Sequence, residues 1–155
     1  STQPIYAGNL YFEPDTPGAW FNAATGFGAL GYALPAAVGA ALAAPNTPVI
    51  CISGDGGAQF SLAEMLVAVQ ESLPILFVIW NSKGYQEIDS SMRAAKVPVV
   101  GCDPEPPDFE SLAKAFRLSF KRCPASDPKT FARLLQDAAK TKRPALIEIE
   151  APYCP

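Results

Sequence analysis

Two short stretches of the sequence place polar side chains and glycines directly after an apolar run. The first covers residues 53–60 (Ser-Gly-Asp-Gly-Gly-Ala-Gln-Phe), follows the apolar residues 49–52, and sets Asp55 between two glycines. The second covers residues 81–85 (Asn-Ser-Lys-Gly-Tyr) and follows the apolar residues 75–80. A carboxylate at a strand end, beside glycine N–H groups that lead into a helix, suits a Mg²⁺ ion that bridges to phosphate. A structural tight turn explains the first stretch equally well at this point.

Two further glycine-containing stretches extend this pattern. Gly8 and Asn9 follow Ile5-Tyr-Ala7, which we expect to form a short first strand. Residues 24–32 hold three glycines, and this spacing lets the backbone come close to a ligand; a flexible turn before a helix is the alternative. Ligands of open α/β sheets bind beyond the carboxyl ends of the strands. Three polar turns are therefore expected at that edge, at residues 8–9, 54–57 and 81–85.

Apolar periodicity and capping residues indicate alternating strands and helices. Residues 49–52 and 75–80 are apolar throughout, as in strands of a parallel sheet that is covered on both faces. Shorter strands are expected at residues 20–22, 118–122 and 145–149. Helices are expected at 34–44 (Leu34, Val38, Ala41 and Leu42 inward), at 62–72 after a Ser61–Glu64 capping box, at 84–95 as a helix or ordered loop, and after the N-caps Asp108 and Asp127. This order predicts a doubly wound α/β fold, with a mostly parallel sheet and helices on both faces.

Composition limits the classes of partner and site. The chain has 155 residues with 49% hydrophobic content, which suits one globular domain over residues 1–155. Its net charge is −3 and it has no basic cluster, so nucleic acid is not an expected partner. No apolar run approaches the roughly 20 residues that span a bilayer, so no membrane partner is expected. The sequence holds no histidine, which excludes histidine-based triads and histidine metal sites within it.

Cysteine usage and the start of the chain bear on its compartment and extent. Cys51, Cys102, Cys123 and Cys154 form no C-x-x-C pair, so we interpret them as reduced structural thiols of a cytoplasmic protein rather than disulfide or zinc ligands. The first residues are polar and do not resemble a signal peptide. Because there is no initiator methionine, we expect a C-terminal fragment of a longer multidomain chain.

The spacing of the two polar stretches resembles a known cofactor motif. Gly54-Asp-Gly56 is followed by 24 residues and then Asn81, which resembles the Gly-Asp-Gly…Asn motif of thiamine-diphosphate (ThDP) enzymes. Residues 26–37 are similar to the glycine-rich segment of the same enzymes. The resemblance covers most of residues 8–90 and is greatest to the C-terminal cofactor-binding domain of the acetolactate synthase and 2-oxo acid decarboxylase family. Residues 8–12 and 84–88 resemble the branch that decarboxylates a guanidino 2-oxo acid.

This resemblance implies a site for ThDP and Mg²⁺. It implies that Mg²⁺ is bound by the side chains of Asp55 and Ser82 and by the Gly84 carbonyl. Cofactor contacts are implied for Gly54, for the N–H groups of Gly56, Gly57 and Tyr85, for Asn81, and for Gly8 and Asn9 from another strand end. The Gly28 carbonyl would accept from the 4′-amino group of the pyrimidine, and Leu30 would be the apolar wedge beneath the thiazolium. The structural alternatives are ordinary core for Leu30, a turn cap for Asn81 and packing for Tyr85.

Three positions depart from the family pattern. Position 82 is usually Asn and here is Ser, whose hydroxyl reaches less far, so that an extra water would complete the metal coordination. Position 57 is often Ser and here is Gly, which keeps the N–H and loses a hydroxyl. Position 10 is His in acetolactate synthases and here is Leu. Two charged residues lie near the motif. Glu87 either faces solvent or meets a cationic substrate tail, and Lys83 is expected to be a solvated loop charge.

The resemblance also implies what the chain does not carry. The glutamate that activates the cofactor lies on a pyrimidine-binding domain of the same or a neighbouring chain, so no catalytic residue is expected here and the isolated chain is expected to be inactive. The implied whole is a lyase or carboligase, a homo-oligomer (dimer or tetramer) that acts on a small 2-oxo acid. The alternative is a non-catalytic, flavodoxin-like nucleotide- or phosphate-binding module, which leaves the glycine-rich segment and Leu30 without a role.

Overall fold

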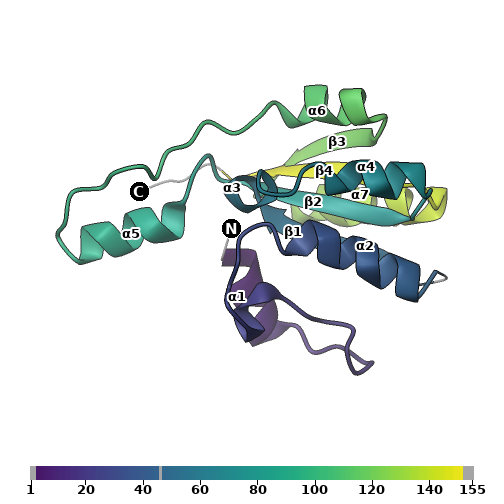
Figure 1. Ribbon diagram of the computed structural model, residues 1–155, viewed down its shortest axis with the longest axis horizontal. Coiled ribbons are helices and arrows are strands. Elements are labelled where there is room, and N and C mark those ends of the chain that lie inside the picture. Colours follow the sequence, from purple (N-terminus) through teal and green to yellow (C-terminus); the bar gives the residue numbers. More distant parts are fainter. Residues whose placement is uncertain (1–2, 46, 152–155) are drawn as a thin grey trace.

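The apolar runs of the sequence form the strands of one parallel sheet (Figure 1). The computed structural model describes residues 3–45 and 47–151. The sheet has four strands in the order β1-β2-β4-β3, and all neighbouring strands are parallel. In chain order the elements are α1 (Gln3–Tyr11), a 3-10 helix (Ala23–Thr25), α2 (Ala33–Ala43), β1 (Val49–Gly54), α3 (Asp55–Ala58), α4 (Glu64–Gln70), β2 (Ile75–Asn81), α5 (Gln86–Ala94), α6 (Phe109–Phe116), β3 (Ser119–Pro124), α7 (Pro128–Thr141) and β4 (Ala145–Glu150).

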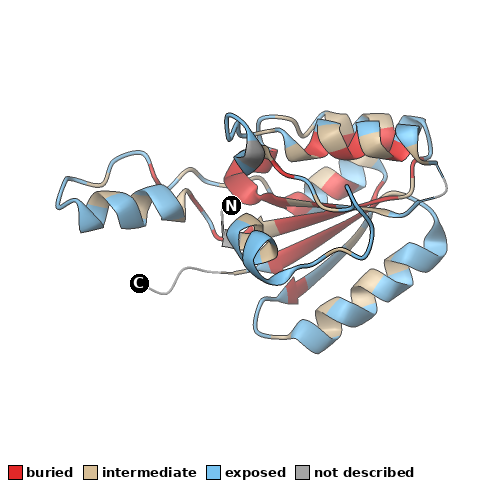
Figure 2. Ribbon diagram, turned by 90° about the horizontal axis from the view of Figure 1, so that it is seen from below, coloured by how far each residue is buried: buried red, intermediate tan, exposed pale blue. Residues whose placement is uncertain are grey.

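Helices cover both faces of the sheet, which explains why the inner strand β2 is apolar from residue 75 to residue 80. On one face, α2, α4 and α6 pack against the sheet around Leu34, Met65 and Phe109. On the other face, α7 packs over Val78 and Ile147. Figure 2 shows the buried residues concentrated in the strands and in the helix surfaces that face them. The predicted doubly wound α/β fold is confirmed.

Two helices begin where the sequence predicts a capping side chain. Asp108 Oδ1 accepts from the N–H groups of Glu110 and Ser111 at the start of α6. Asp127 Oδ1 accepts from the N–H of Thr130 at the start of α7. Such acceptors satisfy N–H groups of the first helical turn that have no partner within the helix. Both predicted N-caps are confirmed.

The predicted first strand at residues 5–7 is wrong, because these residues lie in α1. A helix satisfies its backbone hydrogen bonds within the segment, whereas a short strand needs a neighbouring strand to do so. In the described part of the chain, β1 is an edge strand that pairs with β2 alone. Gly8 and Asn9 therefore lie within a helix and not at the end of a strand.

Two other local expectations also fail. The strand expected at residues 20–22 does not form, because Asn22 turns its side chain onto the N–H of Ala24 and caps the 3-10 helix. The capping box expected before α4 does not form either. Ser61 Oγ donates instead to the carbonyl of Gly31 at 2.8 Å, and α4 begins without a side-chain cap.

The helices differ in how much of their surface is buried. Leu42, predicted to lie on the inner side of α2, is 55% exposed. α5 lies apart from the sheet in Figure 1 and has no buried residue. None of the helices in the described residues is long and apolar enough to cross a membrane. The buried side of α2 consists of Leu34, Ala37, Val38 and Ala41.

Candidate cofactor and metal site

Asp55 is the first residue of α3, where the chain turns from β1 directly into a helix at the carboxyl edge of the sheet. It is buried, with 1% exposed. Gly56, the next residue, lies against the ring of Tyr85, and a Cβ added to Gly56 would overlap Tyr85 Cε1. Glycine at this position therefore lets the tyrosine ring pack directly beside the acidic residue.

The loop after β2 supplies the hydrogen-bond donors that Asp55 meets. The Gly84 N–H donates to Asp55 Oδ2 at 2.9 Å, and Ser82 N and Ser82 Oγ each lie 3.4 Å from Asp55 Oδ1. The loop reaches this position through φ angles of 59° at Lys83 and 141° at Gly84. A Cβ on Gly84 would lie 2.5 Å from the Cys102 carbonyl oxygen, so a larger residue would displace backbone.

The three residues expected to bind the metal lie together in the structure. Ser82 Oγ lies 3.4 Å from Asp55 Oδ1 and 3.3 Å from the Gly84 carbonyl oxygen. Adjacent ligands of an octahedral Mg²⁺ lie about 3 Å apart, which follows from its short metal–oxygen distances. The donors are one carboxylate, one hydroxyl and one carbonyl, all of them hard oxygen ligands. The residues therefore fit Mg²⁺ in both chemistry and spacing.

Asp55 is also a buried carboxylate without a cationic side chain beside it. None of the ion pairs among the described residues includes Asp55. Burying a carboxylate is costly unless it is paired or binds a metal. No group of three His, Cys, Asp or Glu in this part of the chain could hold a metal ion. A metal at Asp55 would therefore depend on one carboxylate plus oxygens from other groups, which is how Mg²⁺ binds with phosphate.

The glycine-rich segment lines a cavity that reaches the same edge of the sheet. The cavity has a volume of about 600 Å³ and is lined by Gly28, Leu30, Gly54 and Gly57, with residues of α1, α2 and β1. Leu30 is 48% exposed, so it is not an ordinary core residue. Its Cδ2 lies 3.6 Å from the position of a Cβ on Gly57. The structure thus brings together four of the positions at which cofactor contacts are expected.

Gly8 and Asn9 serve the packing of α1 instead. Asn9 Oδ1 accepts from Trp20 Nε1 at 2.7 Å and from Asn22 Nδ2 at 2.8 Å. A Cβ on Gly8 would overlap the Trp20 ring, so the helix and the indole are in direct contact. Within the described residues, neither Gly8 nor Asn9 lines the 600 Å³ cavity. The expectation that they reach the site from a strand end is not met, because that strand does not form.

Two other residues expected to contact the cofactor have partners within the chain. The Tyr85 N–H donates to the Cys102 carbonyl at 2.7 Å, so the expected donation to a diphosphate is not available in this arrangement. Asn81 Oδ1 accepts from the Lys83 N–H at 3.1 Å, and Asn81 Nδ2 donates to Glu148 Oε1 at 2.6 Å. Asn81 therefore caps its own turn and connects it to β4, as the structural alternative expects, and its role as a direct cofactor contact stays a prediction.

Glu148 and Arg122 lie beside this loop and are missed by reasoning from sequence. Arg122 Nε donates to Glu148 Oε2 at 2.8 Å. This hydrogen bond raises the pKa of the Arg122 guanidinium above its ordinary value, although partial burial opposes the shift. The available signal is the single carboxylate within the otherwise apolar run 145–149. A charged residue in a strand buried on both faces needs a partner, and the partner is not visible from the local sequence.

The fold and the site define an α/β domain that suits a divalent cation and an anionic cofactor at the carboxyl ends of its strands. Residues 3–149 match the family model described as "Thiamine pyrophosphate enzyme, C-terminal TPP binding domain". The chain belongs to the thiamine pyrophosphate enzyme family, in which it is the C-terminal cofactor-binding domain. This assignment replaces the alternative of a non-catalytic, flavodoxin-like module.

Individual relatives support the same assignment. The chain is 34% identical over 137 residues to a probable 2-ketoarginine decarboxylase of Pseudomonas aeruginosa, covering 88% of this chain and 23% of the relative. It is 35% identical over 113 residues to the acetolactate synthase isozyme 3 large subunit of Escherichia coli, covering 69% and 19%. A solved ThDP-dependent 4-hydroxybenzoylformate decarboxylase of Rhodococcus jostii matches with a TM-score of 0.70 at 28% identity, covering 81% of this chain and 24% of that chain. The chain thus spans about a fifth to a quarter of these relatives' lengths.

Proposed function

We propose that this chain supplies the diphosphate- and Mg²⁺-binding half of the active site of a ThDP-dependent 2-oxo acid decarboxylase or carboligase. The observation that carries the proposal is the buried Asp55 carboxylate. It lies 3.4 Å from Ser82 Oγ, which is itself 3.3 Å from the Gly84 carbonyl oxygen, and it belongs to none of the ion pairs among the described residues. A bound Mg²⁺ would supply the missing positive charge. The family assignment supports ThDP as the anion that completes the site.

The chain's own residues would bind and orient the cofactor, which supplies the reactive carbon and the electron sink for decarboxylation. Asp55, Ser82 and Gly84 would hold the metal. The N–H groups of Gly56 and Gly57, in the first turn of α3, would face the diphosphate, because N–H groups at a helix start have no partner within the helix. Gly54, Gly28 and Leu30 line the adjoining cavity, where the rings of the cofactor would lie.

The rest of the active site belongs to other parts of the protein. We propose that residues 1–155 form a single domain of a longer protein, paired with a pyrimidine-binding domain of the same or a neighbouring chain that carries the activating glutamate. We further propose that the complete protein is a homo-oligomer, a dimer or tetramer, in which neighbouring chains share the site. Buried unpaired thiols at Cys51, Cys102 and Cys123 support a cytoplasmic location; Cys154 lies outside the described residues. The isolated chain should show no turnover of 2-oxo acids, and measurable decarboxylation by it would contradict this division.

The substrate class is a small 2-oxo acid, and one residue favours a cationic tail. Glu87 lies in the first turn of α5, directly after residues 81–85, which we call the metal loop, and is exposed. No ion pair among the described residues includes it. The relative from Pseudomonas aeruginosa is named as a probable decarboxylase of 2-ketoarginine, which is a 2-oxo acid with a guanidino tail. In the complete enzyme, Glu87→Gln should reduce the preference for a guanidino over an aliphatic 2-oxo acid, and unchanged selectivity would exclude this role.

The test of the proposal is cofactor binding by the complete protein that contains this chain. We expect calorimetry to show ThDP binding that depends on Mg²⁺. Asp55→Asn should weaken Mg²⁺ binding in the presence of ThDP by about 100-fold, because it removes the single charged ligand and roughly 3 kcal/mol of charge-assisted interaction. Asp103→Asn, at an exposed carboxylate near the same loop, is the matched control and should bind normally. Equal Mg²⁺ affinity in the two variants would refute the site.

A further inference from the structure

Glu148 is a carboxylate placed in the middle of a buried strand. It lies between Ile147 and Ile149 in β4 and is 4% exposed. In the sheet, Glu148 pairs with Ile79 of β2 on one side and with Arg122 of β3 on the other. Burying a charge of this kind is unfavourable unless each of its oxygens has a partner. Its partners therefore indicate why an ionisable residue is kept at this position.

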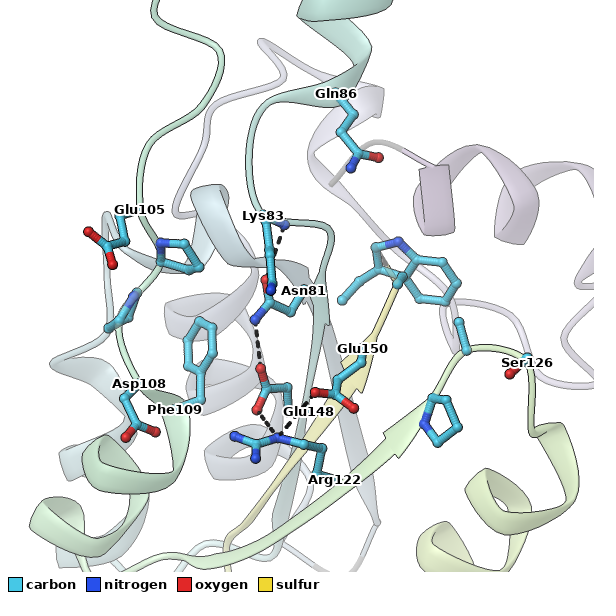
Figure 3. Close-up of a pocket in the computed structure, with 16 residues that line it drawn as sticks. Asn81, Lys83, Gln86, Glu105, Asp108, Phe109, Arg122, Ser126, Glu148 and Glu150 are labelled. Atoms are coloured by element: carbon cyan, nitrogen blue, oxygen red, sulfur yellow. Dashed lines mark hydrogen bonds and ion pairs between the residues drawn. The ribbon is translucent and has the colours of Figure 1, made fainter. Parts of the chain in front are cut away.

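Each oxygen of Glu148 meets one donor, and the two donors come from different strands (Figure 3). Oε2 accepts from Arg122 Nε of β3 at 2.8 Å, and Oε1 accepts from Asn81 Nδ2 at the end of β2 at 2.6 Å. These three residues line a cavity of about 1040 Å³ at the carboxyl edge of the sheet. Glu148 thus connects a cation on one side to the first residue of the metal loop on the other.

The contact with Glu148 fixes the orientation of the Asn81 amide. An ionised carboxylate can only accept hydrogen bonds, so the amide must turn its NH₂ group towards Glu148. Its oxygen Oδ1 is then directed to the Lys83 N–H, which it accepts at 3.1 Å. Lys83 has a φ of 59°, in the left-handed region that non-glycine residues rarely adopt. The Asn81 amide thus stabilises the turn at residues 81–83, in which Lys83 has a conformation that non-glycine residues disfavour.

That turn carries two of the three residues proposed to bind Mg²⁺. Ser82 lies directly before Lys83 and Gly84 directly after it, and both contact Asp55. We propose that Glu148 and Asn81 are positioning residues that hold residues 82–84 in place for the metal, with Arg122 as the cation that pairs with Glu148 and orients it. This inference rests on the proposed function, because it concerns the same Mg²⁺ site. It assigns a role to the pairing of a buried carboxylate with an exposed guanidinium, two residues that are far from the cofactor-binding residues in sequence.

The other acidic neighbours of Arg122 do not reach the loop. Glu150 lies 3.8 Å and Glu110 3.6 Å from the guanidinium, and both side chains are more than half exposed. Exposed pairs at such distances contribute little. Among these three carboxylates, Glu148 alone has a hydrogen bond to Asn81 in the described residues. Glu150 therefore provides a matched control: it has the same charge, lies two positions away on the same strand, and also faces Arg122.

The experiment measures Mg²⁺ affinity in the complete enzyme, by calorimetry or tryptophan fluorescence at a fixed, saturating ThDP concentration. Loss of a residue that orients a metal ligand typically weakens metal binding by about 10–100-fold. We expect a loss in that range for Glu148→Gln and for Asn81→Ala, and less than about twofold for Glu150→Gln. Asn81→Ala keeps the Arg122–Glu148 pair intact, so it tests the inference even where Glu148→Gln destabilises the fold. Normal Mg²⁺ affinity in a folded Asn81→Ala variant would overturn the inference.

A double variant separates positioning from the simple loss of a charge. In Asn81→Asp combined with Glu148→Gln, donor and acceptor change places: the new carboxamide can donate to the new carboxylate and still accept from Arg122. The new carboxylate can also still accept from the Lys83 N–H. We expect Asn81→Asp alone to weaken Mg²⁺ binding, since two carboxylates would then face each other, and the double variant to recover most of the affinity. Failure of the double variant to recover it, with both single variants impaired and all three folded, would overturn the inference.

Asp55→Asn in the same assay keeps this inference distinct from the proposed function. If Asp55→Asn binds Mg²⁺ normally, the metal site itself is misplaced and the proposed function fails. If Asp55→Asn abolishes binding while Glu148→Gln and Asn81→Ala bind normally, the metal site stands and the positioning role is excluded. The expected result is loss in Asp55→Asn, a smaller loss in the two positioning variants, and a normal Glu150→Gln protein.

Discussion

Replacing Gly84 by alanine tests whether the loop after β2 needs glycine in order to close the metal site. Gly84 has a φ of 141°, and an added Cβ would lie 2.5 Å from the Cys102 carbonyl oxygen. That oxygen would have to retreat by about 1 Å to reach ordinary contact, and it also accepts the Tyr85 N–H at 2.7 Å. Backbone strain of this kind costs about 1–3 kcal/mol, and overpacking costs a similar amount. We therefore expect Gly84→Ala to destabilise the chain by about 3 kcal/mol or more.

Gly101→Ala is the matched control for this prediction. Gly101 also has a positive φ, 70°, and stands next to the same Cys102, but an added Cβ would meet nothing within 4 Å. An alanine in this left-handed conformation costs about 1–2 kcal/mol. Part of this cost is offset because alanine lowers the conformational entropy of the unfolded chain. A loss of 1 kcal/mol in stability lowers the midpoint of thermal unfolding of a chain of this size by about 2–4 °C. Gly84→Ala should therefore lower this midpoint by about 6–12 °C, and Gly101→Ala should lower it by less than half as much. Equal shifts in thermal unfolding, followed by circular dichroism, would refute the steric argument.

Three further predictions concern single side chains of the site and the core. Gly57→Ala should unfold at nearly the wild-type temperature, since its Cβ would meet Ser53 Oγ at 3.5 Å and Leu30 Cδ2 at 3.6 Å. Gly56→Ala must displace the Tyr85 ring and should lower the free energy of unfolding by about 1–3 kcal/mol. A lower unfolding temperature for Gly57→Ala than for Gly56→Ala would contradict this packing. Ser82→Ala should weaken Mg²⁺ binding about tenfold in calorimetry, and Ser53→Ala, which removes a buried hydroxyl directed at the Gly54 carbonyl, should not. Burial raises the pKa of the Cys51 thiol to about 12. Between about pH 8.5 and 12 only the unfolded state therefore loses this proton, and the free energy of unfolding should fall by up to about 1.4 kcal/mol per pH unit. If the free energy of unfolding of a Cys51→Ala variant, measured with urea, falls equally steeply with pH, other groups are responsible.

The four strands of the sheet and two helix starts are predictable because the signals for them are local. An apolar run that is buried on both faces and an Asp that caps the next three residues are both readable within a few positions, as Asp108 and Asp127 show. The prediction for residues 5–7 fails because a short apolar run is compatible with either a strand or a helix, and the choice depends on whether a neighbouring strand is present. The prediction for Ser61 fails because a hydroxyl that can cap a helix can equally donate to a distant carbonyl, here that of Gly31.

The site shows the same division at the level of chemistry. Asp55 stands out in the sequence because it follows a buried strand, whereas Ser82 and Gly84 are indicated only by the resemblance to the ThDP motif. The three residues lie together because the parallel strands that precede them are neighbours and end at the same edge of the sheet. The partner of Asn81 could not be chosen, since Glu148 is 67 residues away and its strand is recognisable only as an apolar run. A buried carboxylate within such a run is costly wherever it lies, so its presence indicates that something across the sheet depends on it. In this chain, the element in contact with that carboxylate is the metal loop, through Asn81.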